Sequence, residues 1–419
     1  RDYPPPFLKP PLHTAGVLLW YRGRSMTTDK NIKLLNLYTA FANMIFLLPV
    51  LLPMYRDRMG LGFGDFLIAE SAFAATVVLL EVPSGWLSDI WHRRHTLMLG
   101  LALGALGFFA LCFAYNLLTA IGCHIILGAG FSLLSGTQNA ILYDTLLSAG
   151  REDEYTKYEG RRRAYAFGAV AASSLVAGFM FKIHILLPAI MTGIAHLFGI
   201  VALAFVDEPA RHKAAPEKHP LADMRDTMRY ALTHPEIGGM VIFAALLFTC
   251  TKIIMWSQQA YYMVLNIPEQ AFGVLMAVGY GLASVATWSA HKVDKIMSPR
   301  GAVMTAWGIA VFVTIGAGGY IGLHGVILLM VGGSCIYGFA SPHVETFVNK
   351  RTGSERRATV LSTISFATQL MYVPASIAIG HIDKWAGVHA VLLSLTALLV
   401  LAGGVFFLLR QRARQGTFR

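Results

Sequence analysis

Gly85-Trp86-Leu87-Ser88-Asp89-Ile90-Trp91-His92-Arg93-Arg94 is the stretch of this chain that decides its fold. It lies where one long apolar run, residues 66–87, ends and a second, residues 96–115, begins. The glycine lets two helices approach closely, because it carries no side chain. One aspartate and two arginines fill a turn that is too short to hold a further element. The sequence therefore predicts two long apolar helices joined by a short, charged turn.

The composition places most of the chain in lipid. Hydrophobic residues make up 55% of the 419 residues, charged residues only 14%, and the mean hydropathy is +0.56. A soluble domain has about 25% charged residues. The four cysteines all lie in apolar runs and form no Cys-x-x-Cys pair, so we expect small buried side chains and no metal site.

The net charge of +11 does not indicate nucleic acid as a partner. The basic residues are spread over short segments between apolar runs, whereas a nucleic-acid interface gathers them in one patch or along one helix. The expected partners are the lipid bilayer and a small-molecule substrate, and we expect a monomer.

Twelve apolar runs are long enough to cross a membrane, which takes about 20 residues each. The predicted spans lie near residues 32–54, 66–87, 96–115, 119–147, 162–181, 184–206, 237–262, 270–290, 301–320, 323–345, 357–379 and 388–409. They form two groups of six, residues 30–206 and 237–410. The polar segment 207–236 separates the groups, and its apolar residues recur at helical spacing, which predicts an amphipathic helix on the membrane surface. We expect residues 1–29 to be a disordered cytoplasmic segment and residues 411–419 to be a cytoplasmic tail.

The distribution of lysine and arginine predicts the orientation. If residue 30 is cytoplasmic, the outer loops hold only Arg56, Arg58, Lys182 and Lys384, while the inner loops hold many more basic residues. Such a bias is typical of cytoplasmic loops. We therefore expect both termini in the cytoplasm.

The opening stretch resembles the signature loop of the major facilitator superfamily of secondary transporters, Gly-x-Leu-x-Asp-x-x-Gly-Arg-Arg/Lys. Gly85, Leu87, Asp89, Arg93 and Arg94 match it, and His92 replaces its second glycine. Landmarks near residues 144, 161–163, 345 and 356–357 repeat between the two groups of spans. The resemblance implies an all-α fold of twelve transmembrane helices in two pseudo-symmetric six-helix bundles.

The resemblance also implies a cytoplasmic gate. It places Asp89 at the end of the second helix against the eleventh, and Arg93 near Asp144 at the end of the fourth. Gly85 and Arg94 belong to the same motif. The preceding run, Glu81-Val82-Pro83-Ser84-Gly85, is similar to a run found in bacterial efflux-type members. This similarity implies a protein of the bacterial inner membrane.

Two carboxylates within the second span are candidates for proton coupling. Glu70 and Glu81 are eleven residues apart, about 16 Å along one helix face. A carboxylate within hydrocarbon is costly and normally faces a cavity or a partner, so structural pairing with a cation is the alternative. His196 is a third candidate because histidine titrates near neutral pH.

Lys252 lies near the middle of the seventh span, too far from either end to reach water comfortably. It therefore needs either a carboxylate partner, for which we predict Glu70, or an anionic substrate group. Further candidates for lining a substrate cavity are Asn36, Asn43, Gln258 and Gln369. The alternative for these residues, and for His124, is an interhelical hydrogen bond.

The chain lacks the common signatures of metalloproteases, serine hydrolases and phosphate-binding loops, so we expect neither an enzyme nor a bound cofactor. The prediction is a secondary transporter that moves a small organic solute by alternating access, coupled to protons. Efflux is preferred marginally, because of the run that ends at Gly85. The alternatives are uptake of a metabolite or an anionic chelate such as a siderophore, favoured by Lys252, and a membrane-embedded enzyme or receptor.

Overall fold

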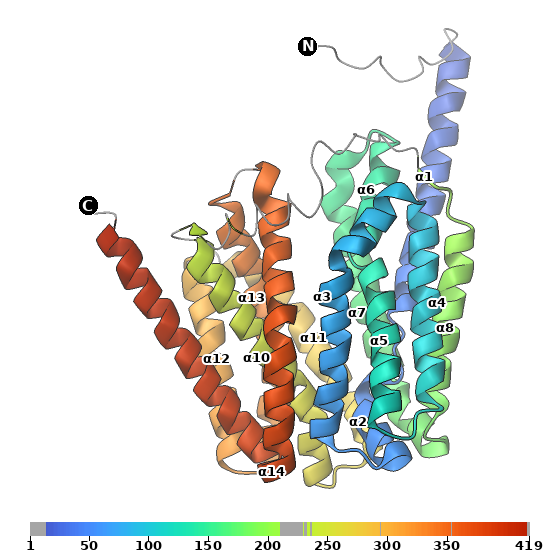
Figure 1. Cartoon of the computed structure of the whole chain (residues 1–419). Coiled ribbons are helices and arrows are strands. Elements are labelled where there is room, and N and C mark those ends of the chain that lie inside the picture. Colours follow the sequence, from blue (N-terminus) through green and yellow to red (C-terminus); the bar gives the residue numbers. More distant parts are fainter. Residues whose placement is uncertain are drawn as a thin grey trace.

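The computed structural model describes residues 14–209, 229, 233–234, 237–293, 295–352 and 354–416. All regular secondary structure in these residues is helical, as predicted. The long helices run roughly side by side, and Figure 1 shows the amino-terminal half on the right and the carboxy-terminal half on the left.

The amino-terminal half begins with a helix that is interrupted. Its elements are α1 (Thr14–Ala42), η1 (Leu48–Val50), α2 (Leu51–Met54), η2 (Tyr55–Met59), α3 (Phe63–Ile90), α4 (Arg93–Leu111), α5 (Leu117–Leu134), α6 (Thr137–Leu147), η3 (Glu152–Glu154), α7 (Tyr155–Ile183) and α8 (Leu187–Ala204). The predicted first span, residues 32–54, is therefore not one helix, because α1 ends at Ala42 and only short helical turns follow. The predicted fourth span also divides, at Gly136, whose φ of 67° suits a residue without a side chain.

The carboxy-terminal half has fewer but longer helices. They are α10 (Ile237–Val264), α11 (Glu269–Val293), α12 (Pro299–Gly319), α13 (Leu323–Asn349) and α14 (Ser354–Gly416). In α14 the backbone bends sharply at Gly387, whose φ of 72° and ψ of −176° are not helical. The predicted spans 357–379 and 388–409 are the two arms on either side of this bend, which meet at the lower end of Figure 1.

Ten helices of the described residues are long and apolar enough to cross a membrane. The last of these windows, Val360–Phe407, contains both arms of α14 and thus two of the predicted spans. The interrupted α1–α2 segment corresponds to the remaining one. The all-α membrane architecture is confirmed.

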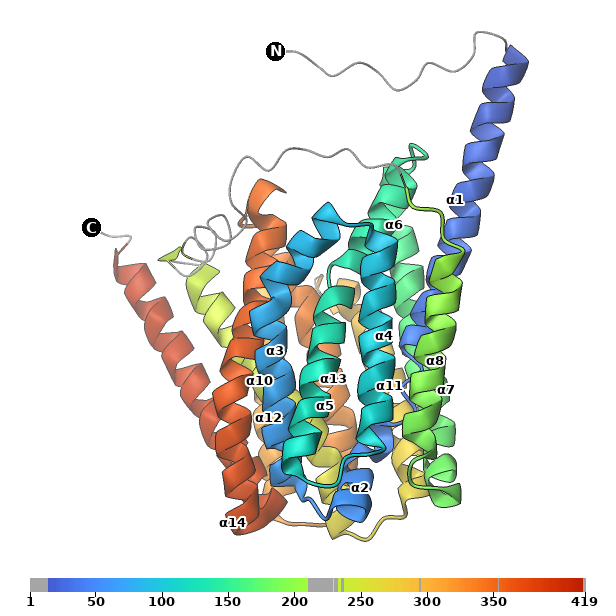
Figure 2. The same ribbon diagram turned by 45° about the vertical axis from the view of Figure 1, so that its right-hand side comes forward.

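Helices extend into both expected end segments, which corrects the expectation of disorder at the amino terminus. The sequence predicts disorder over residues 1–29, but α1 begins at Thr14 and projects beyond the rest of the bundle (Figure 2). Likewise, α14 continues to Gly416, into the expected tail. In each case, helical propensity and continuity with a packed helix extend the helix past the apolar run. The amphipathic helix expected within 207–236 falls mainly outside the described residues.

The most extensive contacts between the two halves involve two pairs of helices, α3 with α14 and α7 with α11. Each pair joins the second helix of one half to the fifth helix of the other, as pseudo-symmetry requires. Glycines allow the contact. A Cβ on Gly64 would strike the carbonyl oxygen of Gly380, and one on Gly273 would strike the carbonyl oxygen of Ser174. Small residues permit such close backbone approach in membrane helices.

Ion pairs accompany both glycine contacts at the same end of the bundle. Lys384 Nζ lies 2.5 Å from Asp65 Oδ1, and a guanidinium nitrogen of Arg56 lies 2.8 Å from Glu269 Oε1. The backbone N–H of Gly64 also donates to Asp383. The halves are therefore closed against each other at the end opposite to the one where α1 projects (Figure 2).

Candidate functional site

A cavity of about 940 Å³ lies between the two halves. Its wall includes residues of α1, α3, α5, α7 and α8 from one half and of α10, α11, α13 and α14 from the other. From Leu48 and Leu51, at the closed end, the cavity extends to Arg162, Arg163 and Glu345. The end of the bundle that it approaches there is the one where α1 projects, and we call it the basic end.

A buried ion pair in this wall joins the halves. Glu70 of α3 lies with its Oε1 3.0 Å from Nζ of Lys252 on α10. The Glu70 side chain is only 7% exposed, whereas that of Lys252 is 21% exposed and lines the cavity. The partner predicted for Lys252 from the sequence is thus the one that the structure places beside it.

Two further residues extend the pair within the amino-terminal half. His124 Nδ1, from α5, lies 3.3 Å from the other carboxylate oxygen of Glu70. This contact is close enough for an ion pair, but it lacks the alignment of a hydrogen bond. On the other side of the ring, Nε2 of His124 lies 2.7 Å from the hydroxyl of Tyr55. For His124 the sequence predicts only an interhelical hydrogen bond, and it does not single out Tyr55.

Aromatic rings and an amide surround the Lys252 ammonium. The ring centroid of Tyr372 lies 4.0 Å from Nζ and that of Phe73 lies 5.5 Å from it. Such rings stabilise a cation through their quadrupole. The oxygen of Gln369 is 3.5 Å away, a long contact. Lys252 therefore keeps stabilising neighbours even without Glu70.

Three other predicted residues also line the cavity. Glu81 lies near its basic end, and no described residue forms an ion pair with it. Asn43 follows the end of α1, where its amide donates to the carbonyl of Thr39. His196 lies in the wall with Nδ1 3.0 Å from the Thr192 carbonyl, so this nitrogen carries the proton. It packs on Phe108, apart from the Glu70 pair.

Two predicted cavity residues lie elsewhere. Asn36 lines a separate groove between α1 and α7. Gln258 is buried inside the carboxy-terminal half, where its amide donates to the carbonyl of Leu329. Its neighbour Gln259 has the role that crosses the halves, because it accepts from the N–H of Leu52 and donates to the carbonyl of Leu48. Gln258 and Gln259 are adjacent on α10, and because successive residues of a helix point in different directions, their side chains reach different partners.

Basic residues of α7 line the cavity and were not predicted. The guanidinium of Arg162 is buried and donates to Glu159 at 2.8 Å and to the amide oxygen of Asn139 at 2.8 Å. Arg163 donates to the same carboxylate at 2.9 Å. One glutamate therefore holds two arginines, and a second, Glu345, lines the cavity with them.

The signature turn forms contacts within the amino-terminal half. Arg93 forms an ion pair with Asp144 of α6, at the place the resemblance implies. Both carboxylate oxygens of Glu208 accept from backbone N–H groups at the start of α4, those of Arg93 at 2.8 Å and Arg94 at 3.0 Å. A carboxylate at this position satisfies free N–H groups and complements the helix dipole. No pattern in the sequence predicts this cap.

Three other residues of the turn, Gly85, Asp89 and His92, are exposed. Asp89 and Gly85 are both accessible, and a Cβ on Gly85 would meet no atom within 4 Å. His92 has a φ of −73° and a ψ of 128°, an extended conformation open to any residue. The turn thus works without the glycine of the family pattern.

Two polar atoms of the cavity wall have neither a hydrogen-bond nor an ion-pair partner among the described residues. They are the hydroxyl of Tyr38 and the indole Nε1 of Trp256, from opposite halves. Buried polar groups normally find a partner, so these two depart from the usual pattern.

The comparison with protein families is decisive. The family model of the Major Facilitator Superfamily matches residues 34–376 of this chain. This chain belongs to the major facilitator superfamily. The comparison with curated proteins gave no match.

Solved structures of transporters share the fold. A mutant of the nucleoside transporter NupG aligns with a TM-score of 0.78 at 15% identity, over 91% of this chain and 99% of that one. The POT family transporter PepTSo gives a TM-score of 0.75 at 11% identity, over 92% of this chain and 98% of that one. A bacterial homologue of the human lysosomal transporter Spinster, in an inward-facing and unoccupied conformation, gives 0.72 at 14%, over 94% and 98%. The chain is therefore a transporter of this superfamily and not an enzyme.

Proposed function

We propose that this transporter couples the movement of a small organic solute bearing a negative group to the movement of protons. The observation that carries the proposal is the Glu70–Lys252 pair, buried between the halves and exposed to the cavity on its Lys252 side. A D-xylose–proton symporter is among the proteins that share the fold, which supports proton coupling.

The pair offers a simple means of coupling. While Glu70 is ionised, it neutralises Lys252, and the cavity offers no free cation at its centre. A proton on Glu70 removes that partner and frees the ammonium for an anionic group of the solute. Proton and solute then support each other's binding, which is a coupling free energy between two sites. His124 contacts the second carboxylate oxygen of Glu70, and the hydroxyl of Tyr55 lies within hydrogen-bond distance of the other ring nitrogen of His124.

Alternating access would follow from the two ends of the bundle. Glycine contacts and ion pairs close one end, while the cavity extends to the basic end. With basic loops cytoplasmic, this state faces inward, and both termini lie in the cytoplasm of a bacterial cell, at its inner membrane. The Arg93–Asp144 pair and Asp89 would form the gate that closes the cytoplasmic end in the opposite state. The protein needs no cofactor and works as a monomer.

Export is the second candidate, favoured by the similarity of the run Glu81–Gly85 to efflux-type members. In that case Glu81, in the cavity wall, would exchange protons against the solute. The two candidates differ in which acid matters and in whether the solute moves with or against the proton.

Flux in proteoliposomes tests the proposal. A panel of radiolabelled organic acids, neutral solutes and organic cations is measured with and without an imposed pH gradient. Accumulation of an acid on the alkaline side, lost in Glu70→Gln but not in Glu81→Gln, is the expected result. Accumulation on the acidic side that depends on Glu81 would favour export. Flux that ignores the pH gradient in the unaltered protein would refute proton coupling.

A further inference from the structure

A second hollow, separate from the cavity, lies between α1 and α7 near the basic end of the bundle. It has a volume of about 560 Å³, large against the roughly 30 Å³ that one water occupies in the liquid. Its wall consists of Asp29, Ile32, Lys33 and Asn36 from α1 and Tyr158, Arg161, Ala164 and Tyr165 from α7. We call it the α1–α7 groove.

The groove lies on a face of α7 that does not line the central cavity. On this face, six of the exposed positions of α7 recur every three or four residues, at 161, 165, 168, 172, 175 and 179. Below Tyr165 this face carries only Gly168, Ala172, Leu175 and Phe179. The arginines that line the central cavity, by contrast, are at 162 and 163. Arg161 therefore stands at the head of an apolar stripe that is exposed outside the transport path.

The side of α1 that faces the groove shows the same arrangement, a basic residue followed by an apolar one. Lys33 is exposed, and Leu37, one helical turn further into the bundle, is 46% exposed. On α7, Tyr165 lies one turn below Arg161 and is 52% exposed. Each wall thus carries a cation at the polar end and an apolar or aromatic side chain beneath it. This sequence of groups is that of the boundary between lipid headgroups and acyl chains.

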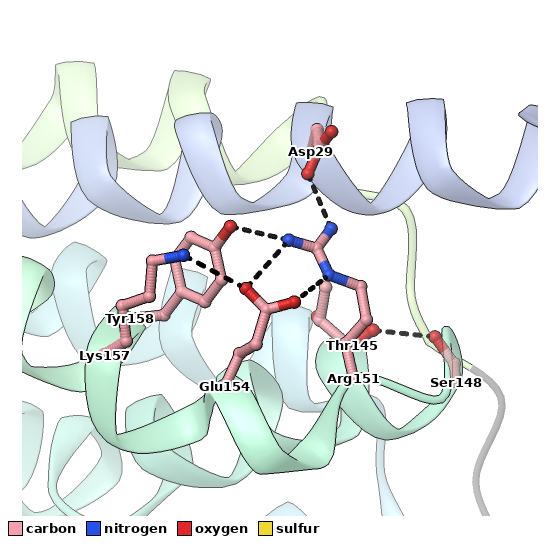
Figure 3. A network of polar contacts seen from close by, with 7 residues as sticks. All are labelled: Asp29, Thr145, Ser148, Arg151, Glu154, Lys157 and Tyr158. Atoms are coloured by element: carbon pink, nitrogen blue, oxygen red, sulfur yellow. Dashed lines mark hydrogen bonds and ion pairs between the residues drawn. The ribbon is translucent and has the colours of Figure 1, made fainter.

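The acidic groups around the groove are already engaged, as Figure 3 shows. Arg151 lies 2.8 Å from Asp29 and donates to Glu154 at 2.9 Å and to the Tyr158 hydroxyl at 2.6 Å. These hydrogen bonds raise the pKa of the Arg151 guanidinium. Lys157 lies 3.3 Å from the same glutamate. The network ties α1 to the start of α7 and consumes both carboxylates.

Lys33 and Arg161 are left over. Neither has a carboxylate within ion-pair distance among the described residues. The guanidinium of Arg161 lies over the ring of Tyr158, 5.4 Å from its centroid. In the wall of the groove itself, the two cations Lys33 and Arg161 accompany one acid, Asp29, which is already paired with Arg151. A net positive, half-enclosed hollow with an apolar lower rim suits a phosphate ester that carries an acyl chain.

We propose that the α1–α7 groove binds the phosphate group of an anionic phospholipid, with Lys33 and Arg161 as its ligands and Leu37 and Tyr165 against its acyl chain. The site is distinct from the solute cavity, so it does not depend on the proposed function. A soluble phosphate ester offers the same anion without the chain, and the test below separates the two sources.

The test is native mass spectrometry of the detergent-solubilised full chain titrated with phosphatidylglycerol, and with phosphatidylcholine as the neutral comparison. Lys33→Gln and Arg161→Gln should each weaken the tightest phosphatidylglycerol binding about fivefold, and the double variant about 25-fold, since each basic residue near an anionic lipid contributes about a factor of five. Lys350→Gln, an exposed lysine at the end of α13, is the matched control and should change nothing.

Several outcomes would overturn the proposal. One is unchanged phosphatidylglycerol binding in the double variant, checked to be folded by its unfolding temperature. Equal binding of phosphatidylcholine would remove the role of the anionic headgroup. Displacement of the lipid by glycerol 3-phosphate at an equal concentration would show that the groove takes a soluble phosphate and that the acyl chain contributes nothing.

Discussion

Lys252→Met and Glu70→Gln each remove one partner of the Glu70–Lys252 pair, and the two changes should lower the free energy of unfolding by different amounts. Lys252→Met leaves a carboxylate whose side chain is 7% exposed, beside the imidazole ring of His124. Breaking a buried pair costs about 3–5 kcal/mol, because the other charge is stranded. Glu70→Gln strands a cation that is 21% exposed to the cavity and stacked on the Tyr372 ring. Because that ring and solvent compensate part of the loss, we expect a cost of about 1–3 kcal/mol.

The double variant Glu70→Gln with Lys252→Met leaves no stranded charge. It should therefore be more stable than Lys252→Met alone, and the coupling energy of the cycle should be about 2–3 kcal/mol. The assay is unfolding in one detergent at fixed pH, followed by intrinsic fluorescence and by the loss of monodisperse protein. Lys30→Met is the control, because the Lys30–Asp207 pair is more than half exposed on both sides and such pairs contribute about 0–1 kcal/mol.

Two results would refute this reasoning. If the two single changes are additive, the ion pair contributes nothing as a pair, whatever its geometry. If Glu70→Gln is the more damaging change, the compensation assigned to Tyr372 and to the cavity is wrong. Either result would also weaken the proposed coupling, which requires that Lys252 remain tolerable without its partner.

Three further predictions concern the ends of the bundle. Arg93→Ala should abolish solute flux in proteoliposomes while leaving the protein monodisperse, since it removes the partner of Asp144 at a partly exposed site; normal flux would exclude the pair from gating. Gly273→Ala should shift spin-label distances across the closed end toward the open state, because its methyl group strikes the backbone of the facing helix, whereas Gly281→Ala, with open space around it, should not. Gln259→Leu removes two hydrogen bonds between the halves, about 1 kcal/mol each, and should shift the same distances in the same direction, with unchanged distances as the contrary outcome.

Some of the site could be predicted because intramembrane charges are rare. Lys252 needs a partner within hydrocarbon, and few acids are available, so Glu70 follows from depth and charge alone. The Arg93–Asp144 contact follows from the resemblance of the signature turn. His124 and Tyr55 could not be predicted in this way, because nothing along a uniformly apolar span indicates which face it turns to its neighbours.

The sequence by itself determined that this protein is a helical membrane protein with a charged turn at Asp89–Arg94 and paired acidic and basic spans. Bilayer thickness and the need to satisfy every backbone group within the segment act locally on each span, so they can be read from composition and length. Only the tertiary structure decided the break after Ala42, the placement of Gln259 across the halves and of Gln258 within one, and the groove that holds Asn36. These features depend on the rotation of each helix about its axis and on backbone contacts between segments far apart in the chain, which no local pattern encodes.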